Sequence, residues 1–138
     1  MNSNTSIADI MTKEVIVLDA NDSLTEAERV FGNHNLRHAP VILRNELVGM
    51  LSLVDLRRSL EFDDDIATKR LAKVGQLMTP DPVHVQIGAT LGDAAKLFME
   101  DDFHAIPVLD GNRVVGIVST TDVIRFLLES LRDLEEES

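Results

Sequence analysis

The chain has 138 residues, of which 44% are hydrophobic and 27% charged, a composition typical of an ordinary globular domain that buries its own core. It has no cysteine, which excludes a thiol nucleophile, a thiolate zinc site and a disulfide framework and agrees with a cytoplasmic location. The net charge of −11, together with the absence of Trp, Tyr and any basic stripe, argues against binding to nucleic acid.

The apolar stretches are short. Runs such as 15–18 are far below the roughly 18 residues that a bilayer span requires, so we expect no membrane insertion. The first six residues, MNSNTS, contain no basic segment followed by an apolar one. We therefore expect the mature start of a chain without a secretory signal.

Much of the acidic charge lies in two clusters, at 61–65 and 133–137. Outside them acids and bases are nearly balanced, so a local pocket can still accept a small anion. The run Asp63-Asp64-Asp65 lacks the glycine and the spaced glutamate of a calcium loop, and the four histidines have no tight ligand spacing. We predict no metal site and no required cofactor, and because no nucleophile-elbow, P-loop or dinucleotide motif is present, no catalytic residue.

The chain is an internal repeat. Met11-Thr12 aligns with Met78-Thr79, and this offset of 67 continues without a gap for 48 residues with thirteen identities, against about three expected by chance. The identities include Gly49 with Gly116 and Asp55 with Asp122. Two copies nearly exhaust the chain, so the sequence is a tandem duplication.

Both copies predict the same succession of elements. In the first copy these are a strand at 15–17, a helix capped by Ser23, strands at 39–43 and 47–52, and a helix after Ser52. In the second copy they are a strand at 83–85, a helix at 90–101, strands at 106–109 and 114–119 joined by an Asp-Gly turn, and a helix after Ser119. Each unit is therefore expected to be β-α-β-β-α.

A unit of about 55 residues is small for an independent core, so we expect the copies to pack through their sheets with pseudo-two-fold symmetry in an α+β fold. The expected segments are repeat 1 at 7–60, a helical connector at 61–73, repeat 2 at 74–128 and an acidic helix end at 129–138. Apolar helix positions expected to be exposed, and to form a homodimer, are Leu56, Leu60, Phe126 and Leu127.

The motif order in each copy is Met-Thr, a strand, a capped helix, Pro-Val, and then Gly-x-x-Ser-x-x-Asp. It resembles the tandem repeat of the cystathionine β-synthase (CBS) domain family over about residues 7 to 128. The resemblance implies clefts between the repeats that bind AMP, ADP, ATP, S-adenosylmethionine or NAD(H). It also implies a regulatory, non-catalytic protein, either a free-standing CBS pair or a domain cut from a longer chain, that signals to an unidentified effector protein.

The resemblance also implies roles for particular residues. Asp55 and Asp122 would accept the ribose hydroxyls, with Ser52 and Ser119 near the phosphates, although Ser-x-x-Asp is also an ordinary helix cap. The remaining candidates would form apolar walls, reach the base or phosphates, or neutralise charge; they are Thr12, Val15, Ile16, Arg37, Ala39, Pro40, Thr79, Pro82, Val83, His104, Ile106, Pro107, Thr120 and Arg125. Core, turn and solvated-surface roles are the alternatives for these residues.

Two other functions remain open at this point. One is a structural or dimerisation module with vestigial clefts, whose acidic C-terminal helix binds a partner. The other is a magnesium-sensing module that uses the acidic clusters.

Overall fold

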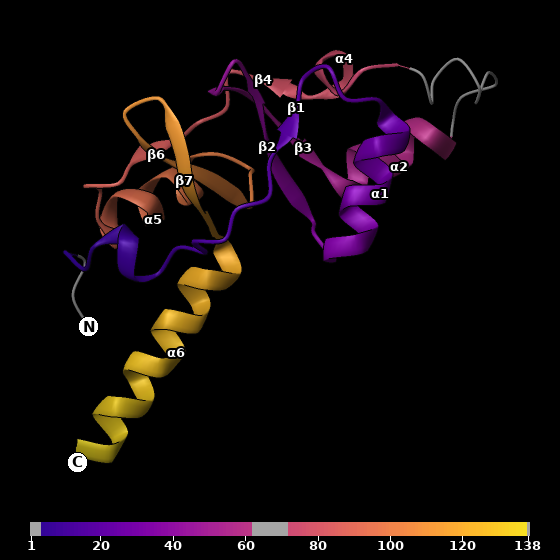
Figure 1. The fold of residues 1–138 in the computed structure, drawn as a ribbon. Coiled ribbons are helices and arrows are strands. Elements are labelled where there is room, and N and C mark those ends of the chain that lie inside the picture. Colours follow the sequence, from indigo (N-terminus) through magenta and orange to yellow (C-terminus); the bar gives the residue numbers. More distant parts are fainter. Residues whose placement is uncertain (1–3, 62–71, 138) are drawn as a thin grey trace. The chain divides into compact units, whose positions relative to one another are not determined.

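The computed structural model describes residues 4–61 and 72–137. The chain divides into two compact units, which we call the repeat 1 unit, Ile16–Pro82, and the repeat 2 unit, Met1–Val15 with Val83–Ser138. Each unit has one small sheet and its own helices, which confirms the α+β class and the two repeats (Figure 1). Residues 62–71 of the predicted helical connector lie outside the described residues.

The repeat 1 unit has a four-stranded sheet in the order β1-β2-β3-β4. Its elements are β1 (Leu18–Asp19), α1 (Leu24–His34), β2 (His38–Leu43), β3 (Glu46–Ser52), α2 (Leu53–Glu61), α4 (Val74–Leu77) and β4 (Thr79–Pro80). Strand β1 is parallel to β2, and the other neighbours are antiparallel.

The repeat 2 unit has a three-stranded sheet in the order β5-β6-β7. Its elements are η1 (Ile7–Asp9), β5 (Val85–Gln86), α5 (Leu91–Glu100), β6 (Ala105–Asp110), β7 (Arg113–Ser119) and α6 (Thr120–Glu137). An isolated antiparallel bridge from Thr12 to Ile117 stands where the repeat 1 unit has β4.

The predicted position of the first strand in each copy is wrong. Residues 15–17 are not in a strand, and the pairing begins at Leu18. In the second copy it begins at Val85, the last residue of the predicted run. The β-branched run marks an extended segment, but a strand also needs hydrogen-bonding partners, and β2 offers only Val41 and Ile42 for parallel pairing.

The predicted helix caps are confirmed. The Ser23 hydroxyl accepts a hydrogen bond from the Glu26 N–H at 3.1 Å. In α5 the exchange is reciprocal, because the Thr90 hydroxyl accepts from the Asp93 N–H at 3.2 Å and the Asp93 carboxylate accepts from the Thr90 N–H at 3.0 Å. These bonds satisfy N–H groups that a helix start otherwise leaves without partners.

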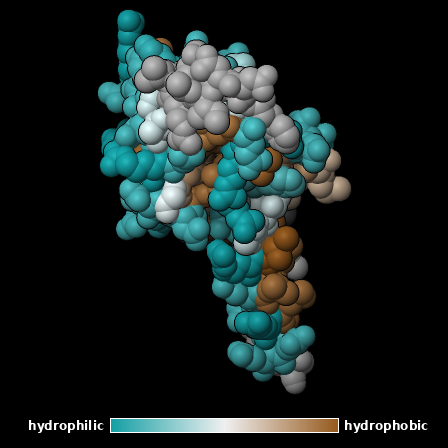
Figure 2. All heavy atoms as spheres, turned by 90° about the vertical axis from the view of Figure 1, so that its right-hand side faces the viewer, coloured by the Kyte–Doolittle hydropathy of each residue, from teal (hydrophilic) through white to brown (hydrophobic). Residues whose placement is uncertain are grey.

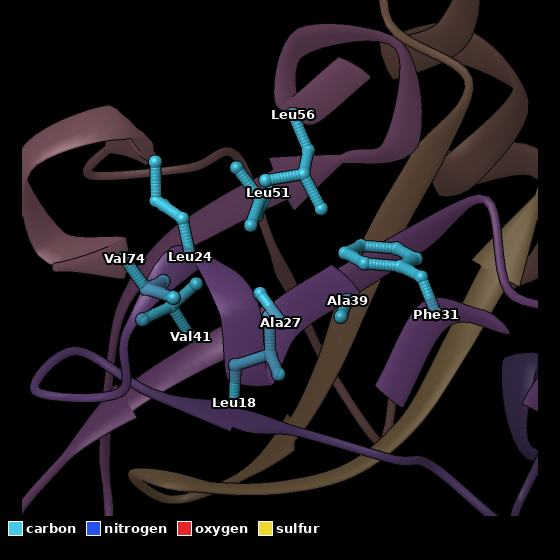
Figure 3. Close-up of a cluster of buried hydrophobic side chains, with 9 residues drawn as sticks. All are labelled: Leu18, Leu24, Ala27, Phe31, Ala39, Val41, Leu51, Leu56 and Val74. Atoms are coloured by element: carbon cyan, nitrogen blue, oxygen red, sulfur yellow. The ribbon is translucent and has the colours of Figure 1, made fainter. Parts of the chain in front are cut away.

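Each unit has its own hydrophobic core between its sheet and its helices. The repeat 1 core contains nine buried residues, among them Phe31, Val41 and Leu56 (Figure 3). The repeat 2 core is built around Ile7, Ile106 and Val118. Leu56 is completely buried, so its predicted exposure is wrong: the helix turns this position onto the sheet rather than toward solvent.

Each sheet is completed by the segment that precedes the other repeat, which the sequence analysis did not predict. The N-terminal strap, residues 5–12, joins the repeat 2 unit, where the Leu91 N–H donates to the Thr5 carbonyl at 2.7 Å. The middle strap, residues 72–80, joins the repeat 1 unit, where the Leu24 N–H donates to the Ala72 carbonyl at 2.9 Å. The two bonds are equivalent under the internal repeat.

Helix α6, the terminal helix of repeat 2, has 18 residues. A hydrophobic strip follows α6 (Figure 2), and its exposed members are Ile124, Leu128, Leu131 and Leu134. Among the described residues, no helix is both long and apolar enough to cross a bilayer.

Candidate functional site

The two faces of the repeat 1 sheet carry different side chains. Ala39, Val41 and Leu51 belong to the core beneath the helices. Side chains alternate along a strand, and directly paired residues share a face, so Pro40 and its partner Met50 lie on the opposite face.

Further predicted site residues share this second face. Ser52 follows Met50 by two residues, and Thr79 of β4 pairs directly with Met50. His38 pairs with Ser52 across the sheet. The sheet therefore brings Pro40, Ser52 and Thr79 together on the side away from the unit's own helices, which we call the open face. Thr79 is exposed on this face, whereas Pro40 is fully buried, so its predicted role as an accessible wall residue is wrong.

The repeat 2 sheet has an equivalent open face. Pro107 pairs with Ile117, and Ser119 lies two residues farther along β7. Thr12 joins from the N-terminal strap: its N–H donates to the Ile117 carbonyl at 2.8 Å, and the Ile117 N–H donates back at 3.1 Å. Thr12 is thus grouped with the repeat 2 residues, although it precedes repeat 1 in the chain.

Two predicted wall residues have their side chains in the cores. Ala39 and Ile106 occupy the same repeat position, and both are completely buried on the helix side of their sheets. Strand alternation separates them from the neighbouring prolines. Their side chains therefore do not contribute to the open faces.

Arg37 and His104 lie beside the starts of the terminal helices. The Arg37 carbonyl accepts a hydrogen bond from the Leu53 N–H at 2.8 Å, and the His104 carbonyl accepts one from the Thr120 N–H at 3.0 Å. Both side chains are exposed. Each unit therefore has the main chain of a basic or titratable residue beside the positive end of the helix that begins after its Ser-x-x-Asp serine.

The two Ser-x-x-Asp motifs differ in their hydrogen bonding. In repeat 2, the Ser119 hydroxyl accepts from the Asp122 N–H at 3.1 Å, and the Asp122 carboxylate accepts from the Ser119 N–H at 2.9 Å. The Asp122 side chain is only 10% exposed and forms an ion pair with Arg125 at 3.2 Å. This motif is a complete helix cap.

In repeat 1 only half of that cap is formed. The Ser52 hydroxyl accepts from the Asp55 N–H at 3.0 Å. The Asp55 carboxylate is exposed and makes no hydrogen bond or ion pair to the described residues. Asp55 is therefore available to a ligand, whereas Asp122 is held by its own helix.

The remaining predicted wall residues mark the places where the chain passes from one unit to the other. Val15 and Ile16 stand at the first passage, and Pro82 and Val83 at the second. None of the four is in a helix or strand. They stay candidates without a defined position on either open face.

The described residues contain no group of three or more His, Asp or Glu side chains that could hold a metal ion. The run at 63–65, on which the magnesium alternative partly depends, lies outside them.

Sequence reasoning missed Met50 and Ile117, which lie on the open faces between the prolines and the serines. The alternation along β3 and β7 was the available signal, because residues two positions before Ser52 and Ser119 must share their face.

Comparison with known proteins gives a consistent result. The family model described as CBS domain matches the chain twice, over residues 7–61 and 74–129. A crystal structure of CBSX2 in complex with AMP is 32% identical, with a TM-score of 0.78, over 91% of this chain and 97% of that one. CBSX2 is a CBS-pair protein from Arabidopsis thaliana.

Two further solved structures are similar. The CBS domain pair of MJ0100, in complex with 5′-methylthioadenosine and S-adenosyl-L-methionine, is 25% identical, with a TM-score of 0.78, over 91% of this chain and 98% of that one. MJ1225 from Methanocaldococcus jannaschii is 25% identical with a TM-score of 0.82, over 92% of this chain but 49% of that one. The chain spans 40%, 32% and 43% of the first curated relatives that it matches, all from Methanocaldococcus jannaschii.

Proposed function

The chain belongs to the CBS domain family, and from this premise we propose that it is a regulatory protein that binds an adenosine-containing ligand at the open faces of its sheets. The proposal is supported by the AMP, methylthioadenosine and S-adenosylmethionine complexes of similar CBS pairs. The observation that carries it in this chain is the exposed Asp55 carboxylate at the start of α2.

The proposed ligand position in the repeat 1 unit follows from the chemistry of its neighbours. The Asp55 carboxylate accepts hydrogen bonds from two ribose hydroxyls. Met50, which is half-buried, offers an apolar contact to the adenine ring, because a thioether makes favourable contacts with aromatic rings. Pro40 beside it is fully buried and supports this surface from beneath. Ser52, Thr79 and the α2 N-terminus attract the phosphate.

The charge of the site favours a monophosphate. Arg37, whose main-chain carbonyl accepts a hydrogen bond at the start of α2, is the candidate cation of the site, and the whole chain carries a net charge of −11. A triphosphate brings more negative charge than one arginine and one helix terminus neutralise. We therefore propose AMP as the preferred nucleotide, ahead of ADP and ATP, and S-adenosylmethionine and NAD(H) as the other ligands to compare with it.

The repeat 1 unit is the proposed stronger site. A ribose can engage Asp122 only by displacing the bonds that this carboxylate makes to the Ser119 N–H and to Arg125. Loss of a charged hydrogen bond costs about 1.5–3 kcal/mol. The same ligand should therefore bind the repeat 2 unit more weakly.

Calorimetric titration tests the proposal with AMP, ADP, ATP, S-adenosylmethionine and NADH as separate ligands. We expect AMP to bind, Asp55→Ala to weaken it about tenfold or more, and Asp122→Ala to affect the stronger site little. Asp133→Ala, which removes another exposed aspartate on α6, is the matched control. Absence of heat and of thermal shift with every ligand would overturn the proposal and favour a structural module.

We also propose that the chain is not an enzyme, acts in the cytoplasm and forms a homodimer that communicates with an effector protein. Support for association comes from the exposed apolar residues of α6, each about half accessible to solvent. A ligand alters such an assembly only through different affinities for its two states.

A further inference from the structure

Each strap contacts its sheet through a methionine that lies on a glycine. Met78 of the middle strap covers Gly49 of β3, and Met11 of the N-terminal strap covers Gly116 of β7. A Cβ atom on Gly49 would lie 2.7 Å from the Met78 Cγ, closer than real Cβ atoms come to other atoms. The glycine therefore provides the space that the methionine occupies.

Both methionines also reach the core of the unit that they contact. Met78 packs against the repeat 1 core, and Met11 packs against the repeat 2 core. A methionine side chain is unbranched and adapts to an irregular gap, which suits a contact between a strap and a sheet edge.

The residue after each methionine is a threonine of the open face. Thr79 pairs with Met50, and Thr12 pairs with Ile117. The Asp81 N–H, just beyond Thr79, donates to the Val48 carbonyl at 3.2 Å. In each strap the methionine and the threonine after it therefore contact adjacent residues of one strand, Gly49 and Met50 in repeat 1 and Gly116 and Ile117 in repeat 2.

We infer that Met78 with Gly49, and Met11 with Gly116, are positioning pairs that fix Thr79 and Thr12 on the open faces. This inference rests on the proposed function in so far as it concerns ligand binding. The positioning itself is a property of the chain that can be measured without a ligand.

The two pairs tolerate an added methyl group differently. At Gly49 the new atom would also lie 3.0 Å from the Thr79 carbonyl oxygen, so the main chain of the strap must move. At Gly116 the three nearest atoms all belong to the Met11 side chain, which can rotate away. Gly49→Ala is therefore expected to displace its threonine more than Gly116→Ala.

The first experiment combines Gly49→Ala with a second change that restores the space. We expect Gly49→Ala to weaken AMP binding about tenfold, as for the loss of one ligand hydrogen bond. Gly49→Ala/Met78→Ala should recover part of that affinity, because it removes the two closest contacts of the new Cβ and leaves the 3.0 Å contact with the Thr79 carbonyl. The double variant still lacks the core packing of Met78, so a purely structural effect predicts no recovery. Gly88→Ala, where a Cβ meets nothing within 4 Å, is the control.

The second experiment needs no ligand and no alanine at position 49. In amide hydrogen exchange, Met78→Ala should speed the exchange of the Asp81 amide, whereas Met99→Ala, at a side chain 88% exposed, should not. Unchanged exchange of Asp81, or a double variant that binds AMP no better than Gly49→Ala, would overturn the inference. If the wild type binds no adenosine ligand while Asp81 responds as expected, the proposed function fails and the positioning pairs stand.

Discussion

At the scale of single residues, Asp55 and Asp122 show how the same residue at the same repeat position can have different roles. Asp122 returns a hydrogen bond to the Ser119 N–H and pairs with Arg125, whereas the Asp55 carboxylate is exposed. The sequence offers both a helix cap and a ligand site for each motif, and the side-chain contacts separate them.

This difference predicts that Asp122 contributes to the stability of the fold and that Asp55 contributes little to it. Asp122→Ala removes half of a reciprocal cap and should lower the free energy of unfolding by about 1 kcal/mol. Asp55→Ala should leave it nearly unchanged, because the Ser52 hydroxyl bonds the main-chain N–H of residue 55. Urea unfolding of both variants measures this, and equal losses would contradict the assignment.

The cap of α5 makes a prediction about pH. The Thr90 N–H and hydroxyl hold the pKa of the Asp93 carboxyl below its ordinary value of 3.8. Because the folded-state pKa is the lower one, this contribution to stability is present above pH 3.8 and is lost as the pH falls below it. Carboxyl-carbon NMR titration should give a lower midpoint for Asp93 in the wild type than in Thr90→Ala, which keeps the main-chain N–H, and equal midpoints would refute the contribution of the Thr90 hydroxyl.

At the scale of elements, both hairpin turns have the backbone that their short connections require. Arg44 and Asn45 have φ values of 53° and 66°, and Gly111 has a φ of 65°. Turns with positive φ match the twist of the adjoining strands. The Gln86 side chain also bonds the Gly111 N–H and carbonyl, at 3.1 and 3.0 Å.

Gly111→Ala should therefore destabilise the protein by about 1 kcal/mol, since a side chain disfavours the left-handed conformation. The surroundings of Gly111 leave room for a Cβ, so the cost comes from the backbone alone. Gly88→Ala is the matched control without a positive φ. Thermal unfolding compares the two, and an equal effect at both positions would argue against the turn.

The elements that the sequence predicted well are those fixed by nearby residues. The caps at Ser23 and Thr90 and the turn at Gly111 depend on contacts only a few residues apart. The start of β1 was missed, and so was the pairing of each strap with the sheet of the other repeat. Both depend on partners that are distant in the sequence, such as Thr12 with Ile117. Local propensity carries no information about which of two similar sheets a strap will join.

Some residues of the candidate site could likewise be predicted from the sequence, and others could not. The repeat indicated Pro40, Ser52 and Thr79, and strand pairing places them on one face. Ala39 and Ile106 precede the prolines directly in the sequence, and strand alternation turns their side chains into the cores. The contrast between Asp55 and Asp122 could not be predicted, because it depends on rotamers and on the Arg125 contact.

At the scale of the whole molecule, a net charge of −11 opposes association while the apolar strip of α6 favours it. We expect a dimer whose dissociation constant falls as salt rises, because salt screens the repulsion between copies. Leu131→Glu with Leu134→Glu should give a monomer, and Met99→Gln, outside α6, should not. Light scattering at two salt concentrations measures this; a wild-type monomer at micromolar concentration in both would contradict it.

The central claim is that an adenosine ligand binds the open face of the repeat 1 sheet through Asp55. Its most direct test is an NMR titration with AMP of protein carrying 13C-labelled methionine methyl groups, one of which belongs to Met50 between Pro40 and Ser52. We expect the Met50 signal to shift as AMP saturates the protein, and we expect Asp55→Ala to need about tenfold more AMP for the same shift. Saturation by AMP with an unmoved Met50 signal, or the same titration midpoint in Asp55→Ala as in the wild type, would rule out this binding mode.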